Sequence, residues 1–198
     1  MIELDGAHYE ELKQAIIETK DVSGATIEIG TRRGGSSVLI MEGNIGTNKP
    51  HISIDPYGNI DYHDIAGIHK SDYTNHMKTQ TMSSLFQWAY EHDYNFIFYN
   101  LEDTEFFNRF ADGVPIYEND KRIESKFSLV FIDGPHHTQA VLDAFNYFKD
   151  KINVNGQIVF DNHNHYDHDT EVEPIILKTK KYSLHLTGPD KKVYKKIS

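Results

Sequence analysis

The sequence predicts an α/β fold: a doubly wound, mostly parallel sheet with helices on both faces and an antiparallel hairpin at its C-terminal end. Residues 25–29 form a short β-branched, apolar run, as is typical of a buried parallel strand, and a glycine turn and an apolar helical run follow it. Strand-like and helix-like segments then alternate along the chain. Finally, the strand-like residues 182–186 and 192–197 are joined by the turn sequence Gly188-Pro189-Asp190, which predicts the hairpin.

The expected helices follow from the spacing of apolar side chains and from capping residues. Leu12 and Ile16 share one helical face near the N-terminus. Ser36 and Ser37 offer N-cap oxygens to the apolar run at residues 38–41. We therefore expect helices over residues 7–20, from Ser36 to residues 44–46, over 77–92, over a short stretch containing Phe106 and Phe110, over 138–149 and over 173–180.

The expected strands are short apolar runs bounded by turn residues. They cover residues 25–29, 51–55, 96–99, 127–133 and 157–161. A turn is expected at Asn155-Gly156, just before the last of these strands. The long polar connection over residues 57–76 is typical of a lid or binding loop, and residues 111–126 are expected to form a charged surface loop.

Length and composition predict one domain over residues 1–198 and exclude several classes of function. The net charge of −10 argues against nucleic acid as a partner, because neutralisation of phosphates dominates that kind of binding. The chain has no cysteine, so it has neither a disulfide framework nor a thiolate metal site. No apolar run approaches the roughly 20 residues of a membrane span, and no signal peptide is recognised, so we expect a cytoplasmic protein with no membrane partner.

The turn after the first predicted strand indicates the kind of ligand. A dinucleotide fingerprint would need a glycine where Arg32 stands, and a Walker loop would need Gly-Lys-Ser/Thr. Glu28 would repel a phosphate but could attract an ammonium or a sulfonium group, either directly or through backbone amides. The pattern Glu28-x-Gly30-x-x-x-Gly34 resembles motif I of the class I S-adenosyl-L-methionine-dependent methyltransferases. A glycine turn of some other Rossmann-like domain is the alternative.

Two further acidic residues stand at predicted strand ends. Asp55 ends the second strand, 25 residues after Gly30, where it is placed to accept hydrogen bonds from a ribose diol. The alternative is a turn-forming aspartate before Pro56. Asp103 follows the third strand, where adenine or ribose could bind, but capping of the next helix by Asp103 or Thr104 explains it equally well.

A second group of polar residues predicts a metal site. Asp133 ends one core strand, and Asp161 and Asn162 end the next. Because parallel strands point their carboxyl ends to the same rim, these side chains are expected to converge beside the Gly30 turn. Carboxylate and amide oxygens without thiolates favour a hard cation such as Mg²⁺. For each aspartate taken alone, the alternative is a turn residue.

Three segments carry a more specific resemblance: residues 27–37, 130–136 and 155–162. Together they resemble the metal-dependent O-methyltransferases of the catechol and macrocin-type sugar methyltransferase groups, over about residues 25–162. The segment before the first strand is shorter than in many of those enzymes, which leaves the acceptor and any homo-oligomer interface open. His136 stands where the catechol enzymes have a lysine, and this favours the sugar-type branch.

The resemblance implies a role for each matching residue. The implied residues are Glu28, Gly30 and Ser36 for the methionine part of the donor, Asp55 for its ribose, Asp133, Asp161 and Asn162 for the metal, and Asp133 or His136 as the catalytic base.

The implied activity is Mg²⁺-assisted transfer of a methyl group to a hydroxyl of a small molecule, such as a sugar. A metal would lower the pKa of the acceptor hydroxyl, and His136, with an unperturbed pKa near 6.5, would take its proton. The alternatives are that His136 caps the helix near Thr138 or lies on the surface. At the level of the whole protein, the alternatives are a metal-dependent hydrolase, a non-catalytic cofactor-binding subunit and an NAD-linked oxidoreductase, the last of which Arg32 disfavours.

The run His163, His165 and His168 allows two interpretations. It could bind Zn²⁺ or extend the metal pocket, but its spacing matches no familiar zinc motif. A solvated or substrate-facing loop is therefore the preferred prediction.

Overall fold

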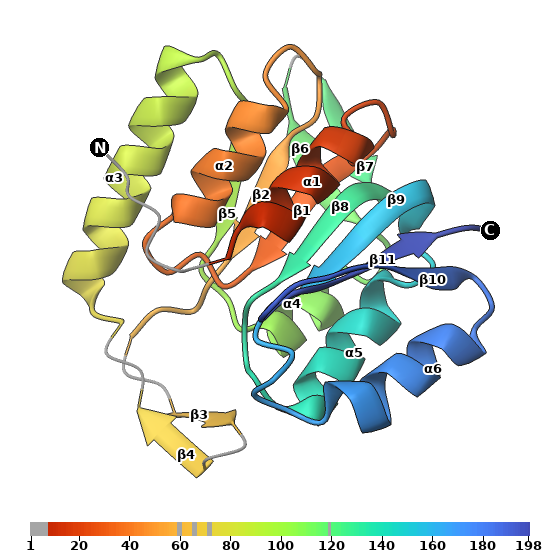
Figure 1. The fold of residues 1–198 in the computed structure, drawn as a ribbon. Helices are drawn as coiled ribbons and strands as arrows, with labels where there is room; N and C mark the ends of the chain where they lie inside the picture. The colour runs from red at the N-terminus through yellow and green to blue at the C-terminus, as the bar shows by residue number, and fades with distance from the viewer. Residues whose placement is uncertain (1–7, 59–60, 65–66, 71–72, 119) are drawn as a thin grey trace.

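The computed structural model describes residues 8–58, 61–64, 67–70, 73–118 and 120–198. In this part of the chain a seven-stranded sheet forms the centre, with the strand order β10-β11-β9-β8-β1-β2-β5 (Figure 1). Its strands are β1 (Ala25–Ile29), β2 (His51–Ile54), β5 (Phe96–Tyr99), β8 (Phe127–Ile132), β9 (Ile152–Phe160), β10 (Tyr182–Thr187) and β11 (Lys192–Lys196). The strands from β9 to β5 run parallel, and β11 is antiparallel to both β9 and β10. The predicted sheet and its C-terminal hairpin are confirmed.

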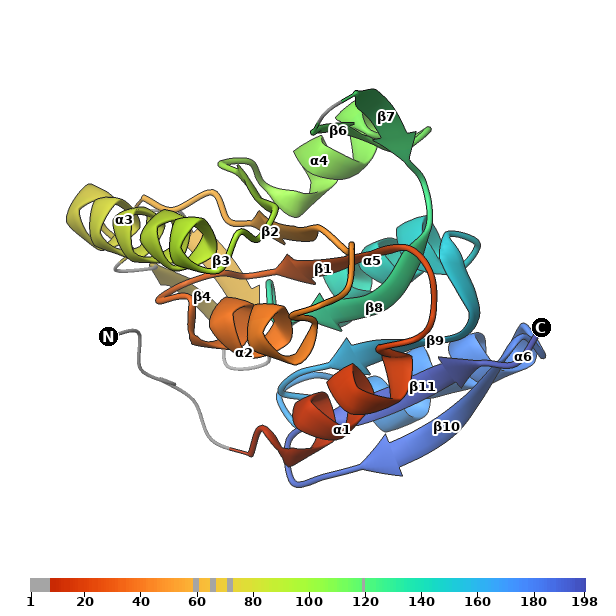
Figure 2. The same cartoon turned by 90° about the horizontal axis from the view of Figure 1, so that it is seen from above.

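Helices cover both faces of this sheet. Figure 2 shows α1 and α2 on one side and α5 and α6 on the other. α3 packs on α2 and β5, and α4 packs on α5. Within the described residues, none of the helices has the length and apolarity needed to cross a lipid bilayer. The helices are α1 (Glu10–Thr19), α2 (Gly35–Gly43), α3 (Asn75–Glu91), α4 (Asp103–Arg109), α5 (Thr138–Phe148) and α6 (Glu173–Lys178), the last preceded by a π-helical turn, η1 (His168–Val172).

Alternate residues of β8 face two separate apolar clusters. Leu129 and Phe131 pack in the cluster that includes α1, whereas Val130 and Ile132 pack with Phe145 of α5. Side chains of a strand alternate between the two faces of a sheet, and here helices cover both faces. Every residue of β8 is therefore buried, as expected of a central parallel strand.

Two connections that the sequence predicts to be irregular contain β-hairpins. β3 (Asp61–Asp64) pairs with β4 (Gly67–Lys70) inside the predicted lid, and Figure 1 shows this hairpin projecting away from the sheet. Residues 59–60, 65–66 and 71–72 of the lid lie outside the described residues. β6 (Val114–Tyr117) pairs with β7 (Lys121–Glu124). The predicted loop at 111–126 is wrong there because Val114 and Ile116, two residues apart, are both buried in the main core.

The turn predicted at Asn155-Gly156 does not separate two elements, but the chain bends there inside a longer strand, β9. β9 runs through these residues, and the pairing of β8 with β9 shifts register between Phe127 and Leu129. Asn155 has a φ of 68°, and a Cβ atom at Gly156 would lie 2.8 Å from the carbonyl oxygen of Ser128. The two residues therefore form a bulge that brings two strands close together.

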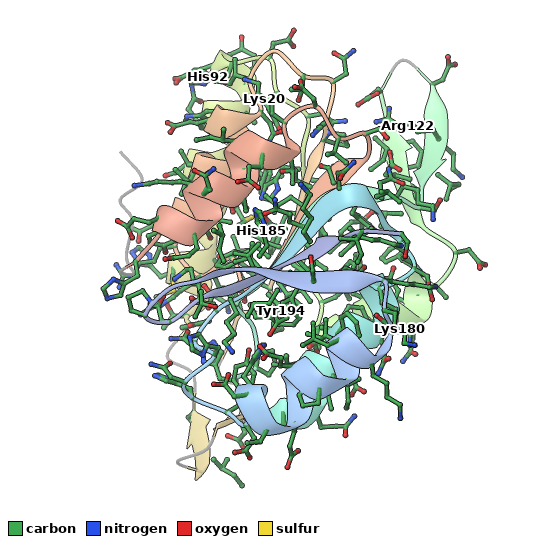
Figure 3. The ribbon with its side chains drawn as sticks, turned by 45° about the vertical axis from the view of Figure 1, so that its right-hand side comes forward. Lys20, His92, Arg122, Lys180, His185 and Tyr194 are labelled. Atoms are coloured by element: carbon green, nitrogen blue, oxygen red, sulfur yellow. The ribbon has the colours of Figure 1, made fainter. Side chains whose placement is uncertain are left out.

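The C-terminal hairpin lies between helices of both faces. Figure 3 shows His185 of β10 on the α1 side and Tyr194 of β11 on the α6 side. His185 Nε2 lies 2.6 Å from Glu18 Oε2 of α1, and Tyr194 packs with Ile176 of α6. These contacts attach the hairpin to helices on both faces of the sheet.

Candidate functional site

A cavity of about 500 Å³ opens at the carboxyl ends of the parallel strands. Each of five strands ends in a residue or turn that lines it, because parallel strands place their carboxyl ends at one edge of the sheet. β11 runs in the opposite direction, so it is the start of β11 that reaches this edge. Of the predicted site residues, those that line the cavity are Gly30, Ser36, Asp55, Asp103, Asp133, His136, Asp161 and Asn162.

Gly30 allows the turn after β1 to lie directly against the turn after β8. Its φ is 92°, and a Cβ atom at this position would lie 2.0 Å from the carbonyl oxygen of Asp133. Its backbone N–H donates to the carbonyl of Ile54 at 2.9 Å, and the N–H of Asp133 donates to the carbonyl of Ile29, also at 2.9 Å. A side chain would therefore separate the two turns that form the cavity.

Glu28 does not contact the cavity. It is fully buried beneath the turn, and its carboxylate accepts hydrogen bonds from Ser36 Oγ at 2.8 Å, from Ser53 Oγ at 2.7 Å and from the hydroxyl of Ser37. Burial raises the pKa of Glu28, but hydrogen bonds from His51 and the serines outweigh it and hold that pKa below its usual value. Of the two modes of action that the sequence left open for Glu28, direct or through the backbone, the contacts favour the indirect one, because Glu28 holds the serines in the first turn of α2.

The serines of α2 also differ from their predicted role. The N-cap of α2 is Gly34, in the left-handed conformation, and no side-chain cap bond is made. Ser36 and Ser37 lie inside the first turn, and their hydroxyls donate to Glu28. A hydrogen bond from a hydroxyl to an ionised carboxylate is stronger than one between a hydroxyl and a neutral backbone amide. The tertiary contact with Glu28 therefore replaces the cap.

Asp55 holds the backbone of two turns. Its Oδ2 accepts hydrogen bonds from the amides of Thr31 and Arg32 at 3.0 and 2.9 Å, and its Oδ1 accepts from the amide of Tyr57 at 2.8 Å. Burial raises the pKa of Asp55, and these amides offset part of that effect. The residue thus has the turn-forming role that the sequence allowed, while it also lines the cavity.

Asp103 lies in the first turn of α4 and is largely buried. The N-cap of α4 is Glu102, which makes no side-chain cap bond, so the predicted capping by Asp103 or Thr104 is wrong. Asp103 Oδ1 accepts a hydrogen bond from the amide of Thr104 at 2.7 Å, and burial raises the pKa of its carboxyl group. Its carboxylate lines the cavity on the side of β5.

Asp133 and Asp161, called here the acid pair, converge as predicted. Burial raises the pKa of Asp133 well above its usual value, and the charge and hydrogen bond of Asp161 raise it further. Asn162 follows with a φ of 49° and lines the same cavity. The expected juxtaposition of these three residues is thus observed.

Lys191 was not predicted, and it lies against the acid pair. Its Nζ is 2.6 Å from Asp161 Oδ1 and 3.1 Å from Asp190 Oδ1, and its side chain is only 2% exposed. Burial lowers the pKa of Lys191, but the two carboxylates outweigh burial and raise it overall. No local sequence pattern marks Lys191: its place beside Asp161 follows from the register of the folded hairpin, in which Lys192 pairs with Phe160.

The contacts of Lys191 bear directly on the predicted Mg²⁺ site. In the chain segments that the structure describes, no third His, Cys, Asp or Glu side chain joins Asp133 and Asp161 in an arrangement that could hold a metal ion, so the third predicted ligand is the amide of Asn162. One of the two predicted carboxylate ligands, Asp161, is already paired with the Lys191 ammonium. The residues present therefore fit a divalent cation poorly.

His136 points toward the acid pair, and its neighbour caps the helix. His136 Nε2 lies 3.4 Å from Asp133 Oδ1. His137 is the N-cap of α5, where its Nδ1 accepts a hydrogen bond from the amide of Ala140 at 3.3 Å. The capping role that the sequence offered for His136 thus belongs to His137, and His136 is left facing the cavity.

The histidine run does not form one loop. His168 is 1% exposed, and its ring nitrogens lie 3.1 Å from the Tyr166 hydroxyl and 2.9 Å from the Tyr194 hydroxyl. Burial lowers the pKa of His168 to about 4, helped by the charge of Lys192. The prediction of a solvated or substrate-facing loop is therefore wrong for His168, which belongs to the core.

Comparison with known proteins identifies the family. Residues 27–163 match the family described as a methyltransferase domain. A protein of Acanthamoeba polyphaga mimivirus, described as uncharacterized protein R132, is 30% identical over 152 residues, which cover 77% of this chain and 57% of that protein. The chain thus spans less than two thirds of that relative.

Solved structures share the fold. The O-methyltransferase NovP has a TM-score of 0.62 at 16% identity, covering 96% of this chain and 79% of its own. An O-methyltransferase from Bacillus cereus in complex with S-adenosylhomocysteine has a TM-score of 0.59 at 13% identity, covering 100% and 84%. The S-adenosylhomocysteine-bound Podospora anserina methyltransferase PaMTH1 has a TM-score of 0.56 at 13% identity, covering 98% and 80%. Because the family match extends over more than half of the sequence, the chain belongs to the methyltransferase-domain family.

Proposed function

We propose that this protein is an S-adenosylmethionine-dependent O-methyltransferase that acts on a hydroxyl group of a small molecule, such as a sugar. The observation that supports this proposal best is that one cavity is lined both by the Gly30 turn and by the acid pair. Its volume of about 500 Å³ lies in the range of small-molecule sites. A donor and an acceptor can therefore meet in it.

In this proposal the donor lies along the ends of β1, β2 and β5. Gly30 and Ser36 contact its methionine part, Asp55 accepts hydrogen bonds from its ribose, and Asp103 lies near its adenosine. The three amides on Asp55 leave acceptor capacity, since an ionised carboxylate has about four lone-pair sites. Carboxylates outnumber cationic side chains in the cavity lining, which favours a positively charged sulfonium.

The acceptor hydroxyl lies beside His136 and the acid pair. The acceptor oxygen attacks the methyl carbon, the carbon–sulfur bond breaks, and neutral S-adenosylhomocysteine leaves. The hydroxyl proton passes to the His136 imidazole, which lines the cavity. We assign the base to His136 because burial and Asp161 raise the pKa of Asp133, which makes Asp133 the weaker candidate for an ionised base at neutral pH.

The expectation of Mg²⁺ assistance does not enter this mechanism. Asp133, Asp161 and Asn162 supply suitable oxygens, but the Lys191 ammonium already neutralises Asp161. What remains for catalysis is proton transfer to His136 and the alignment of the two reactants, which alone can supply about 7–11 kcal/mol of a barrier.

Titration calorimetry with S-adenosylhomocysteine tests the donor half of the proposal. We expect saturable binding, and its absence would favour a hydrolase on the same fold. A library of sugars, phenols and other alcohols, incubated with methyl-labelled donor, tests the acceptor half. Binding of S-adenosylhomocysteine without methylation of any hydroxyl would favour a non-catalytic, cofactor-binding subunit.

A further inference from the structure

We infer that the Lys191 ammonium occupies the cation position beside the acid pair, at the acceptor end of the cavity. By doing so it prevents a divalent metal ion from binding there. The inference deepens the proposed function and rests on it for one consequence: methyl transfer by this chain proceeds without a metal. The exclusion of the metal itself can be tested without knowing the acceptor.

The position of Lys191 is set by the sheet. The antiparallel pairing of β11 with β9 sets Lys192 opposite Phe160, so the residues just outside this pair, Lys191 and Asp161, meet at the edge of the sheet. The hairpin is fastened on the other side as well, because the N–H of Gly188 donates to the carbonyl of Lys191 at 2.8 Å. Backbone pairing therefore places this lysine beside Asp161 independently of the contacts of its side chain.

The contacts of Lys191 are those of a buried, charged group. Its Nζ lies 2.6 Å from Asp161 Oδ1 and 3.1 Å from Asp190 Oδ1, and 5.0 Å from the ring centre of Tyr9. With 2% of its side chain exposed, it cannot turn away into solvent without breaking both ion pairs. Breaking these ion pairs would leave an uncompensated charge in a buried site, which costs free energy. The ion pairs therefore keep the lysine side chain in this position.

A divalent ion on Asp161 would have to share this carboxylate with the ammonium. The two cations would then lie within a few ångströms of each other in a largely buried site, where repulsion between like charges is strong. Lys191 instead supplies positive charge at the acid pair, and a fixed cation there favours a negative charge developing on a nearby acceptor oxygen. Lys191 thus acts without touching the reacting atoms, because its positive charge stabilises negative charge on the acceptor oxygen.

The test is a titration of the full-length protein with Mn²⁺, followed by electron paramagnetic resonance of the free ion, alongside calorimetry with S-adenosylhomocysteine. For the natural sequence we expect no Mn²⁺ binding that depends on Asp161. For Lys191→Met, which keeps the apolar stem and removes the charge, we expect Mn²⁺ affinity to rise at least tenfold. Lys191→Arg is the matched control, because it keeps the positive charge and should bind no Mn²⁺.

The double variant Lys191→Met/Asp161→Asn identifies the site, since the gained Mn²⁺ binding should be lost again. Two results would overturn the inference: Mn²⁺ binding by the natural protein that Asp161→Asn abolishes, or no gain of binding in a Lys191→Met protein that still binds S-adenosylhomocysteine. If Lys191→Met does not fold, the titrations of the natural protein and of Lys191→Arg decide. Failure of the proposed function is a separate result, namely the absence of S-adenosylhomocysteine binding by the natural protein.

Discussion

At the scale of single residues, Gly30 and Asp55 hold the same turn by different means. Gly30 provides a backbone conformation and an absence of side-chain volume, and Asp55 provides an acceptor for the amides that follow the turn. His136 and Lys191 then face the opposite end of the cavity, each beside one member of the acid pair. The chemistry of the site is thus divided between backbone geometry on the donor side and charged side chains on the acceptor side.

Replacing Gly30 by alanine should disrupt the site and destabilise the fold. The new Cβ would lie 2.0 Å from the Asp133 carbonyl oxygen, and φ is 92°. We expect the free energy of unfolding in urea to fall by about 3 kcal/mol or more, with loss of S-adenosylhomocysteine binding. Gly46→Ala is the matched control: Gly46 has a φ of 81° but nothing within 4 Å of its Cβ position. It should lose only the conformational cost of about 1–2 kcal/mol. Equal losses in the two variants would contradict the close approach.

Replacing His136 by asparagine should affect the chemical step and leave donor binding unchanged. We expect kcat to fall about a hundredfold or more, because the hydroxyl proton loses its acceptor. The Kd of S-adenosylhomocysteine should not change. His165→Asn is the control: the His165 ring lies 6.1 Å from the His136 ring, and it should leave kcat nearly unchanged. A variant of His136 with full activity would return the role of base to Asp133.

At the scale of elements, the C-terminal hairpin and the π-helical turn before α6 are joined through one buried histidine. His168 at the start of η1 lies between the hydroxyls of Tyr166 and Tyr194, and Tyr194 belongs to β11. Beside it, Lys192 Nζ lies 2.9 Å from Glu173 Oε2 and 2.6 Å from Asp169 Oδ1. This contact region sets the position of β11 and so, indirectly, of Lys191.

The buried histidine makes the stability of this region depend on pH. Burial lowers the pKa of His168 to about 4 in the folded protein, whereas the unfolded value is about 6.5. Above pH 6.5 both states are neutral; as the pH falls below 6.5 only the unfolded state takes up the proton. Stability should therefore fall by about 1.4 kcal/mol per pH unit, or about 3 kcal/mol between pH 6.5 and 4. Urea unfolding of the natural protein and of His168→Gln at several pH values measures the contribution of His168 to this pH dependence. Identical pH slopes for the two proteins would contradict it.

At the scale of the whole molecule, the sequence predicted what depends on strand ends and missed what depends on contacts between distant segments. Asp55, Asp133 and Asp161 could be placed because parallel strands share one rim. Lys191 could not be placed from the sequence, because only the antiparallel register of β11 with β9 brings it beside Asp161. The serine cap of α2 was predicted wrongly for the same reason, since it loses to the buried carboxylate of Glu28, which local sequence patterns do not weigh.

Donor binding should stabilise the entire sheet, because the cavity draws its lining from the ends of five strands. At a hundredfold excess of S-adenosylhomocysteine over its Kd, the gain is about 2.7 kcal/mol, which for a domain of this size raises Tm by about 5–10 °C. ATP is the control ligand: it shares the adenosine, but its triphosphate should be repelled by the carboxylates of the lining. Differential scanning fluorimetry with both ligands measures the effect. An ATP shift as large as that of S-adenosylhomocysteine would mean that the acidic lining does not select a sulfonium donor, since only the shared adenosine would then account for binding.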